Sequence, residues 1–210
     1  MNGSTMPARL ALAAALLLAG AVAASGTQPA PAPAFPAADL GVDRAAAPDT
    51  VGDWPGFNAR LWRDGRVFIG GQPDSTALAG AKQRGITCVV NLRTPAEMAD
   101  RKRVPYDEAA TAEALGLEYV LLPMGDAQHP YTTAAVDSLA AALARHDGPV
   151  LLHCTVGWRA AHAWVAYLVR HQGWPFPEAL ARGERIAISE SPFSGLLGRP
   201  VRLQAEEKAP

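Results

Sequence analysis

The chain has 210 residues, 49% of them hydrophobic and 19% charged, a length that allows one ordinary domain beside terminal segments. Its formal net charge of −1 argues against a nucleic-acid partner, and the basic run at 101–103 contains no interleaved aromatic residue. Two cysteines, Cys88 and Cys154, are too few for a disulfide scaffold. The sequence shows no cluster of metal ligands, and neither a metal nor a cofactor is expected.

The first residues have the features of a secretory signal peptide. Arg9 precedes an apolar run from Leu10 to Ala24, and residues 21–23 offer an A-x-A cleavage site. A retained membrane anchor is the alternative, but the run is shorter than the roughly 18 apolar residues of a spanning helix. We therefore predict that residues 1–23 are a signal peptide, that the protein is periplasmic or secreted from a bacterium, and that it has no stable membrane insertion after cleavage.

The next segment, residues 24–50, repeats Ala-Pro steps and has few large apolar residues. Such a composition cannot build a core and predicts a disordered, semi-extended linker. The remainder, residues 51–210, is then the folded domain.

Turn signals divide this domain into alternating elements. Residues 59–71 predict a hairpin around Asp64-Gly65, and residues 74–85 predict a helix that is capped by Asp74 or Ser75. Residues 86–93, "ITCVVNLR", are β-branched and apolar, as in a strand buried on both faces.

The alternation continues to the end of the domain. Helices are predicted over 106–116, 132–148, 159–173 and 177–187, with strands over 118–124 and 149–154 and a polar tail at the end. The third helix is capped by Thr132 or Thr133, and its apolar stripe is Val136, Leu139 and Leu143. This order predicts an α/β fold, a central and mainly parallel sheet flanked by helices, with ligands bound beyond the carboxyl ends of the strands.

The stretch "HCTVGWRAA", residues 153–161, stands at such a strand end. Backbone amides of a glycine-containing loop and of the following helix N-terminus would form a nest for an anion. The nest and Arg159 would stabilise a Cys154 thiolate, Gly157 would permit the bend, and Arg159 could grip two oxygens of a phosphate or sulfate. Taken singly, Cys154 would be interpreted as a buried strand cysteine and Arg159 as a surface arginine. Their combination, with Gly157 between them at a strand-to-helix junction, favours an active site.

The stretch resembles the H-C-x-x-G-x-x-R signature of cysteine-dependent protein tyrosine and dual-specificity phosphatases. Together with "LWRDGRVFIGGQP" and "VVNLRTPAE" upstream, it is similar to the phosphatase-like domain of beta-lactamase hydrolase-like proteins, over about residues 60–183. The resemblance implies a phosphatase fold, a phosphorylated small molecule or phosphoprotein as substrate, Cys154 as nucleophile and Arg159 as the phosphate-binding arginine. The loop residues His153, Thr155, Val156, Gly157 and Trp158 would line the substrate, with His153 hydrogen-bonded within the loop.

Two departures keep other functions open. Four residues separate Cys154 from Arg159, where the phosphatase signature has five, and rhodanese-type sulfurtransferases use this shorter loop around a persulfide. Ala160 stands where active phosphatases place a serine or threonine that eases thiolate departure. A sulfurtransferase and an anion-binding domain without turnover are therefore the alternatives to a phosphatase-like hydrolase.

Asp126 is the candidate general acid, because it is the one acid in the loop "PMGDAQHPYTT" at the distance upstream where the phosphatase superfamily places such an aspartate. The alternative is an aspartate that caps a turn, and His129 is a weaker donor.

Three other residues are assigned structural roles. Trp158 could stack on substrate or pack on a helix. Arg93 ends a parallel strand and could face the same mouth, but it is interpreted as half of a surface ion pair with Glu97. Cys88 begins its strand and Cys154 ends another, about five residues apart in level, so we expect no disulfide and a core position for Cys88.

Overall fold

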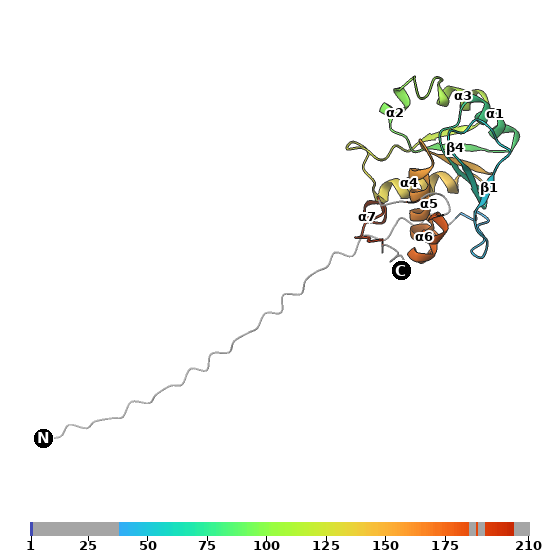
Figure 1. The fold of residues 1–210 in the computed structure, drawn as a ribbon. Coiled ribbons are helices and arrows are strands. Elements are labelled where there is room, and N and C mark those ends of the chain that lie inside the picture. Colours follow the sequence, from blue (N-terminus) through green and yellow to red (C-terminus); the bar gives the residue numbers. More distant parts are fainter. Residues whose placement is uncertain (2–37, 185–187, 189–191, 204–210) are drawn as a thin grey trace, which may run out of the picture. The chain divides into compact units, whose positions relative to one another are not determined.

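The computed structural model describes residue 1, residues 38–184, residue 188 and residues 192–203. The predicted signal peptide and the first part of the predicted linker lie outside these residues. Figure 1 shows the arrangement of the elements. Strands in the described chain are β1 (Asp49–Val51), β2 (Leu61–Asp64), β3 (Val67–Gly70), β4 (Cys88–Asn91), β5 (Glu118–Leu121) and β6 (Val150–His153). Helices are α1 (Ser75–Gln83), α2 (Pro95–Ala99), α3 (Glu108–Ala114), α4 (Thr133–Ala144), α5 (Trp158–His171), α6 (Phe176–Glu184) and α7 (Phe193–Leu197).

The strands form one mixed sheet in the order β1-β2-β3-β6-β4-β5. The strands from β3 to β5 in this order pair in parallel, while β1, β2 and β3 form an antiparallel meander at one edge. Gly65 makes the predicted hairpin turn at φ 58°, a left-handed conformation that costs glycine little. The predicted α/β fold class is confirmed.

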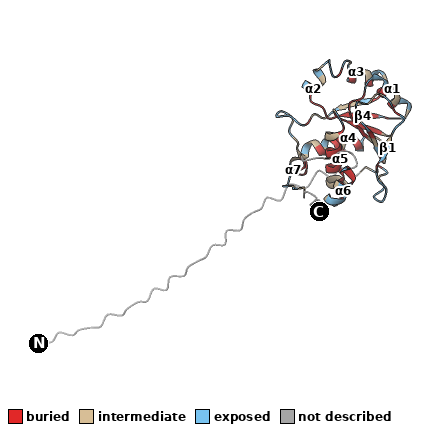
Figure 2. Ribbon diagram, viewed as in Figure 1, coloured by how far each residue is buried: buried red, intermediate tan, exposed pale blue. Residues whose placement is uncertain are grey.

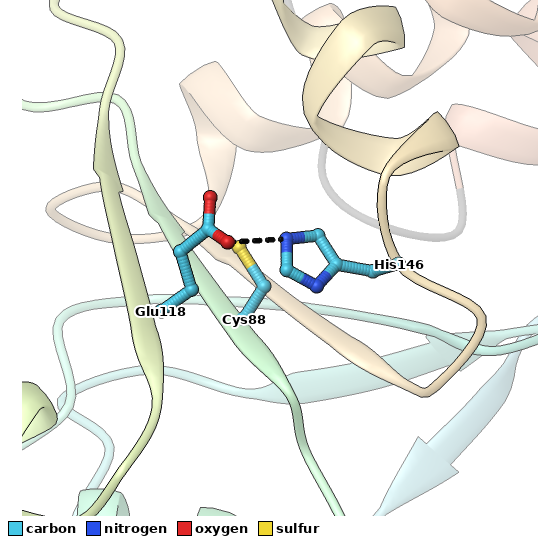
Figure 3. A group of neighbouring side chains, drawn as sticks. All are labelled: Cys88, Glu118 and His146. Atoms are coloured by element: carbon cyan, nitrogen blue, oxygen red, sulfur yellow. Dashed lines mark ion pairs between the residues drawn. The ribbon is translucent and has the colours of Figure 1, made fainter.

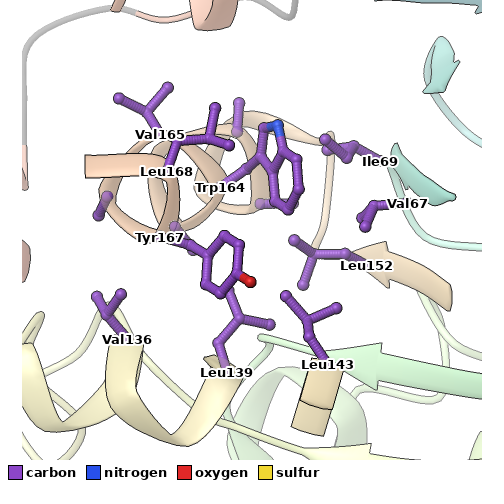
Figure 4. Packing of buried hydrophobic residues seen from close by; sticks show 14 of the residues in the cluster. Val67, Ile69, Val136, Leu139, Leu143, Leu152, Trp164, Val165, Tyr167 and Leu168 are labelled. Carbon is purple, nitrogen blue, oxygen red and sulfur yellow. The ribbon is translucent and has the colours of Figure 1, made fainter. Parts of the chain in front are cut away.

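Alternate strand residues point to opposite faces of the sheet, and each face has its own helices. Val89 and Leu151 pack with α1 and α3, whereas Val90 and Leu152 pack with α4, α5 and α7. Buried residues line the strands and the sheet-facing sides of the helices (Figure 2). Figure 4 shows the larger cluster, with Trp164 of α5 among the aliphatic side chains. Each such fully buried large side chain contributes about 1.5–3 kcal/mol.

Helix starts follow the predicted caps. The Asp74 carboxylate accepts a hydrogen bond from the Ala77 amide at 2.8 Å, and the Thr132 hydroxyl accepts one from the Ala135 amide at 3.2 Å. Of the alternatives offered by the sequence, Asp74 and Thr132 are therefore the caps. Each cap satisfies an amide that the first turn of a helix leaves without an intrahelical partner.

Two predicted boundaries need correction. Part of the predicted linker, residues 38–50, lies against the domain: Leu40 is buried, its carbonyl accepts from the Arg66 amide at 2.9 Å, and β1 begins at Asp49. The predicted polar tail contains α7, whose Phe193 and Leu196 are buried in the core. The end of the last predicted helix, residues 185–187, lies outside the described residues.

Cys88 and Cys154 are both free thiols, as predicted. They lie on neighbouring parallel strands, and Cys88 is in register with Val150, four residues before Cys154. At about 3.3 Å per residue this offset exceeds the reach of a disulfide. Cys88 is a fully buried core residue.

No helix in the described ranges combines the length and the apolar character that a membrane crossing requires.

Candidate active site

The loop that carries Cys154 begins where β6 ends, in the middle of the sheet. The Cys154 amide donates to the Gly70 carbonyl at 3.3 Å, and the Gln72 amide donates to the Thr155 carbonyl at 3.1 Å. These bonds extend the β3–β6 pairing past the strand ends and hold the loop in place. Only 2% of Cys154 is exposed, so the thiol lies at the floor of the loop.

Gly157 turns the chain from this loop into α5. Its φ is 87°, a left-handed conformation, and it occupies the N-cap position without a side-chain cap. A Cβ added there would lie 3.4 Å from the carbonyl carbon of Gly70. The helix begins at Trp158, so its positive N-terminal end faces the loop, as the sequence predicts for an anion site.

Arg159 is held by a carboxylate from a separate element. Its two terminal nitrogens donate to Glu97 of α2 at 2.9 and 3.2 Å, and Nη1 also donates to the Leu92 carbonyl at 2.8 Å. The third nitrogen, Nε, is buried and has no hydrogen-bond partner among the described residues. The guanidinium is thus fixed at one end, and its buried Nε–H is left to donate.

Glu97 is a functional residue that the sequence interpretation missed. It closes a capping box with Thr94, and its Oε1 accepts from the Thr155 hydroxyl at 2.9 Å. Burial raises the pKa of Glu97, but hydrogen bonds from Arg159, Thr94 and Thr155 lower it to about 2. The sequence prediction did not include α2, although the pattern T-P-A-E at 94–97 is a capping-box signal from which its start could have been found.

The predicted ion pair between Arg93 and Glu97 is present, but Arg93 is buried and does not lie on the surface. It is 1% exposed, and its Nη1 donates to Gln72 Oε1 at 2.5 Å while its Nη2 donates to the Glu97 carbonyl at 3.2 Å. Its Nε lies 3.7 Å from the Glu97 carboxylate. The strand end turns Arg93 inward, where it ties α2 to the segment after β3.

His153 is not a substrate contact, because its side chain is completely buried behind the loop. Its Nε2 pairs with Glu108 Oε1 of α3 at 2.7 Å, and Gln72 donates to the other oxygen of Glu108. Burial raises the pKa of Glu108, but the charge and hydrogen bond of His153 outweigh it, so the pKa lies below its ordinary value. The predicted hydrogen bond of His153 therefore leads to α3 instead of the loop.

Asp126 caps a turn in the described conformation. Its Oδ1 accepts from the amides of Gln128 and His129 at 2.9 and 2.6 Å and pairs with His129 Nδ1 at 2.9 Å. Desolvation raises the pKa of Asp126, but the hydrogen bonds from His129 and Gln128 lower it below its ordinary value. The structure thus realises the capping alternative, and Asp126 is engaged within its own loop.

The same loop nevertheless touches the site through Gly125 and Tyr131. A Cβ on Gly125 would lie 2.8 Å from the Tyr131 hydroxyl and 3.1 Å from Arg159 Nε. Burial raises the pKa of Tyr131, although the Arg159 charge lowers it, so the phenol keeps its proton at neutral pH. Sequence reasoning missed Tyr131 because only tertiary contact brings it to Arg159.

The rest of the loop divides into exposed and internal residues. Val156 is 56% exposed and forms an apolar edge of the loop. The Trp158 ring packs on His162 one turn later, with ring centroids 4.1 Å apart, which realises the helix-packing alternative. Ala160 is buried in the core and presents no hydroxyl.

Residues 66–168 match the family of the beta-lactamase hydrolase-like protein, phosphatase-like domain. Two beta-lactamase hydrolase-like proteins, from two strains of Xylella fastidiosa, are each 32% identical over 95 residues. That stretch is 45% of this chain and 21% of each relative, so the chain spans about a fifth of their length. The resemblance that the sequence predicted is confirmed.

Solved phosphatases share the fold. Tk-PTP in the active form is 24% identical, with a TM-score of 0.53 over 65% of this chain and 95% of that one. PTPMT1 is 21% identical, with a TM-score of 0.51 over 63% of this chain and 87% of that one. PTPMT1 is also known in complex with PI(5)P. The family match and the fold together support a phosphatase-type hydrolase, as predicted.

Proposed function

We propose that this phosphatase-like domain hydrolyses a phosphate monoester through a cysteinyl-phosphate intermediate. The observation that carries the proposal is the arrangement of Arg159. Glu97 and Leu92 fix its terminal nitrogens, while its buried Nε, at the start of the helix that follows the Cys154 loop, has no hydrogen-bond partner among the described residues. A buried donor without an acceptor is costly, and an oxyanion bound over Cys154 would satisfy it.

The chemistry follows from the donors around the thiol. The Cys154 thiolate attacks phosphorus, so an S–P bond forms as the bond to the leaving oxygen breaks. Arg159 and the amides of residues 155–159 hold the phosphoryl oxygens, and a proton passes to the leaving oxygen. Water then attacks phosphorus, which releases phosphate and restores the thiol. Because Ala160 offers no hydroxyl to the departing sulfur, we expect the second step to be the slower one.

Asp126 remains our proposed proton donor, on the condition that its turn rearranges. A general acid must carry a proton, whereas the hydrogen bonds to residues 128 and 129 favour the carboxylate. The role therefore requires that this turn rearranges when substrate binds.

We expect Asp126→Asn to lower kcat/KM, which reports the first step, about 10²–10⁴-fold for an alkyl phosphate and far less for p-nitrophenyl phosphate. An alkoxide needs a proton to leave, whereas p-nitrophenolate leaves without one. Steady-state rates on both substrates test this, with His129→Gln as the control that keeps the acid. Equal losses on the two substrates would assign Asp126 to the turn alone, and a selective loss in Tyr131→Phe would move the role to Tyr131.

A sulfurtransferase is the second candidate, favoured by the four-residue spacing between Cys154 and Arg159. In it, Cys154 would carry a sulfane sulfur between a thiosulfate-like donor and a thiol or cyanide acceptor. A sulfane sulfur is smaller than a phosphoryl group and would suit the shorter loop. The third candidate is an anion-binding domain that does not turn over.

One paired assay separates the three candidates. Full-length protein is tested for p-nitrophenyl phosphate hydrolysis and for sulfur transfer from thiosulfate to cyanide, with Cys154→Ser and Cys88→Ser in parallel. We expect phosphate release that Cys154→Ser abolishes and Cys88→Ser retains. Sulfur transfer without phosphate release would contradict the proposal, and anion binding without either activity would favour the binding domain.

Export is proposed from the amino-terminal sequence alone, as a periplasmic or secreted location after removal of residues 1–23. The substrate class is a phosphorylated small molecule or a phosphoprotein, and the PI(5)P complex of PTPMT1 makes a phosphoinositide headgroup one compound to include in a panel. Localisation of a tagged full-length chain, with and without residues 1–23, tests the export proposal.

A further inference from the structure

Three side chains with different donor atoms meet at the other end of the sheet from Cys154. Cys88 begins β4 and is in register with Glu118, which begins the parallel strand β5. His146 follows the end of α4. Figure 3 shows the three side chains converging, and one ligand atom of each lies within 4.8 Å of the others.

We propose that Cys88, Glu118 and His146 bind one divalent metal ion of the zinc type. The donors would be Cys88 Sγ, a Glu118 carboxylate oxygen and His146 Nε2. A thiolate, an imidazole and a carboxylate are the ligands that Zn²⁺ takes in proteins, and three protein ligands leave a fourth position for water. Bonds of about 2.0–2.3 Å place tetrahedral donors roughly 3.3–3.8 Å apart, which small side-chain rotations from the present arrangement would reach.

The imidazole supplies the second observation. His146 Nε2 is buried and lies 3.2 Å from Glu118 Oε2, the ion pair drawn as a dashed line in Figure 3, but this contact lacks the geometry of a hydrogen bond. A buried ring nitrogen without a hydrogen bond is costly. A metal ion between nitrogen and oxygen would satisfy both groups.

The surrounding backbone also favours a cation. Helix α4 ends at Ala144, two residues before His146, and its final carbonyls give this end a negative partial charge. The Glu118 carboxylate is contacted by Arg145 Nη2 at 3.1 Å and by His146 Nε2 at 3.2 Å. The site therefore combines an anion and a helix C-terminus around the imidazole.

Two features oppose metal binding: Arg145 competes for the Glu118 carboxylate, and the Cys88 thiol must lose its proton. Arg145 donates to Glu118 Oε1 at 3.1 Å, but it is 53% exposed along its side chain and can turn to solvent. Burial raises the pKa of Cys88 to about 12, so the thiol is protonated without metal. Binding must replace that proton: the S–H bond breaks, a metal–sulfur bond forms, and one proton is released to solvent.

The test uses the full chain carrying Cys154→Ser, so that Cys88 is the one remaining thiol. Zn²⁺ is titrated against a chromophoric chelator, and Co²⁺ is added separately to record the sulfur-to-cobalt charge-transfer band. We expect one ion per chain and a charge-transfer band that Cys88→Ser removes. Glu118→Gln and His146→Gln should each weaken Zn²⁺ binding at least tenfold, whereas Arg145→Gln should tighten it because the competing cation is gone.

A matched variant and a stability measurement keep the result interpretable. His129→Gln removes another imidazole paired with a carboxylate and should leave Zn²⁺ affinity unchanged. Zn²⁺ should raise the thermal midpoint of the Cys154→Ser chain and fail to do so after His146→Gln, since a ligand stabilises only the state that binds it. No stoichiometric binding, or Zn²⁺ affinity that His146→Gln leaves intact, would overturn the proposal.

Discussion

Arg159→Lys is expected to lower kcat/KM for a phosphate monoester about 10²–10³-fold while the domain stays folded. The arginine makes three contacts at once: two to the Glu97 carboxylate and one to the Leu92 carbonyl, with Nε left to donate. A lysine ammonium is a single point charge, so pairing with Glu97 would leave no fixed donor directed at the anion. Steady-state kinetics, with far-ultraviolet circular dichroism as the check on folding, measure the effect.

The control for this variant lies on the same helix. Arg170 of α5 pairs with Asp137 at 2.8 Å and is not part of the loop, so Arg170→Lys should keep activity within about twofold. Glu97→Gln should lower kcat/KM by an amount between those of Arg170→Lys and Arg159→Lys, because the glutamine amide oxygen still accepts from Arg159 but no longer balances its charge. If Arg159→Lys kept a tenth or more of the wild-type kcat/KM, the grip assigned to Arg159 would be wrong.

Glu108→Ala is expected to reduce the free energy of unfolding by about 3–5 kcal/mol, which corresponds to a fall of roughly 6–20 °C in the thermal midpoint. The substitution removes the partner of two buried groups, the His153 imidazole and the Gln72 amide. The buried imidazole would then have no hydrogen bond within the described chain, whereas Gln72 would keep its bond to the Pro73 carbonyl at 3.1 Å. The loss of contact between α3 and the strand before Cys154 should also lower kcat. Thermal unfolding and activity are measured on the same preparation.

Glu113→Ala is the matched control, since Glu113 lies on the same helix with its side chain exposed and should change the midpoint little. Glu108→Gln tests the charge if the alanine variant does not fold. The pKa of Glu108 is lowered in the fold, so its stabilisation is complete above the ordinary glutamate pKa and is lost as pH falls through the lowered value. Glu108→Gln should remove that part of the acid-induced loss of stability. If the free energy of unfolding of Glu108→Gln fell with decreasing pH as it does in the wild type, the stabilising role given to the Glu108 carboxylate would be wrong.

Most of the fold could be predicted from the sequence because its signals are local. Asp74 and Thr132 cap their helices through amides three residues away, Gly65 and Gly157 take left-handed conformations, and the β-branched run before Asn91 forms a buried strand. Each signal acts over a few residues of chain. The contribution of α7 was missed because its five residues gain stability from burial in the core, which a short segment does not reveal.

The same distinction between local signals and tertiary contacts applies to the candidate site. The sequence by itself determined that a cysteine, a turn glycine and an arginine meet at a strand end, because the strand, the loop and the helix that carry them are consecutive. Only the tertiary structure decided that Glu97 holds Arg159 and that Glu108 holds His153 behind the loop. The Arg159 and His153 partnerships join residues 45 to 62 positions apart, and the orientation of a side chain among such neighbours depends on packing that no local pattern encodes.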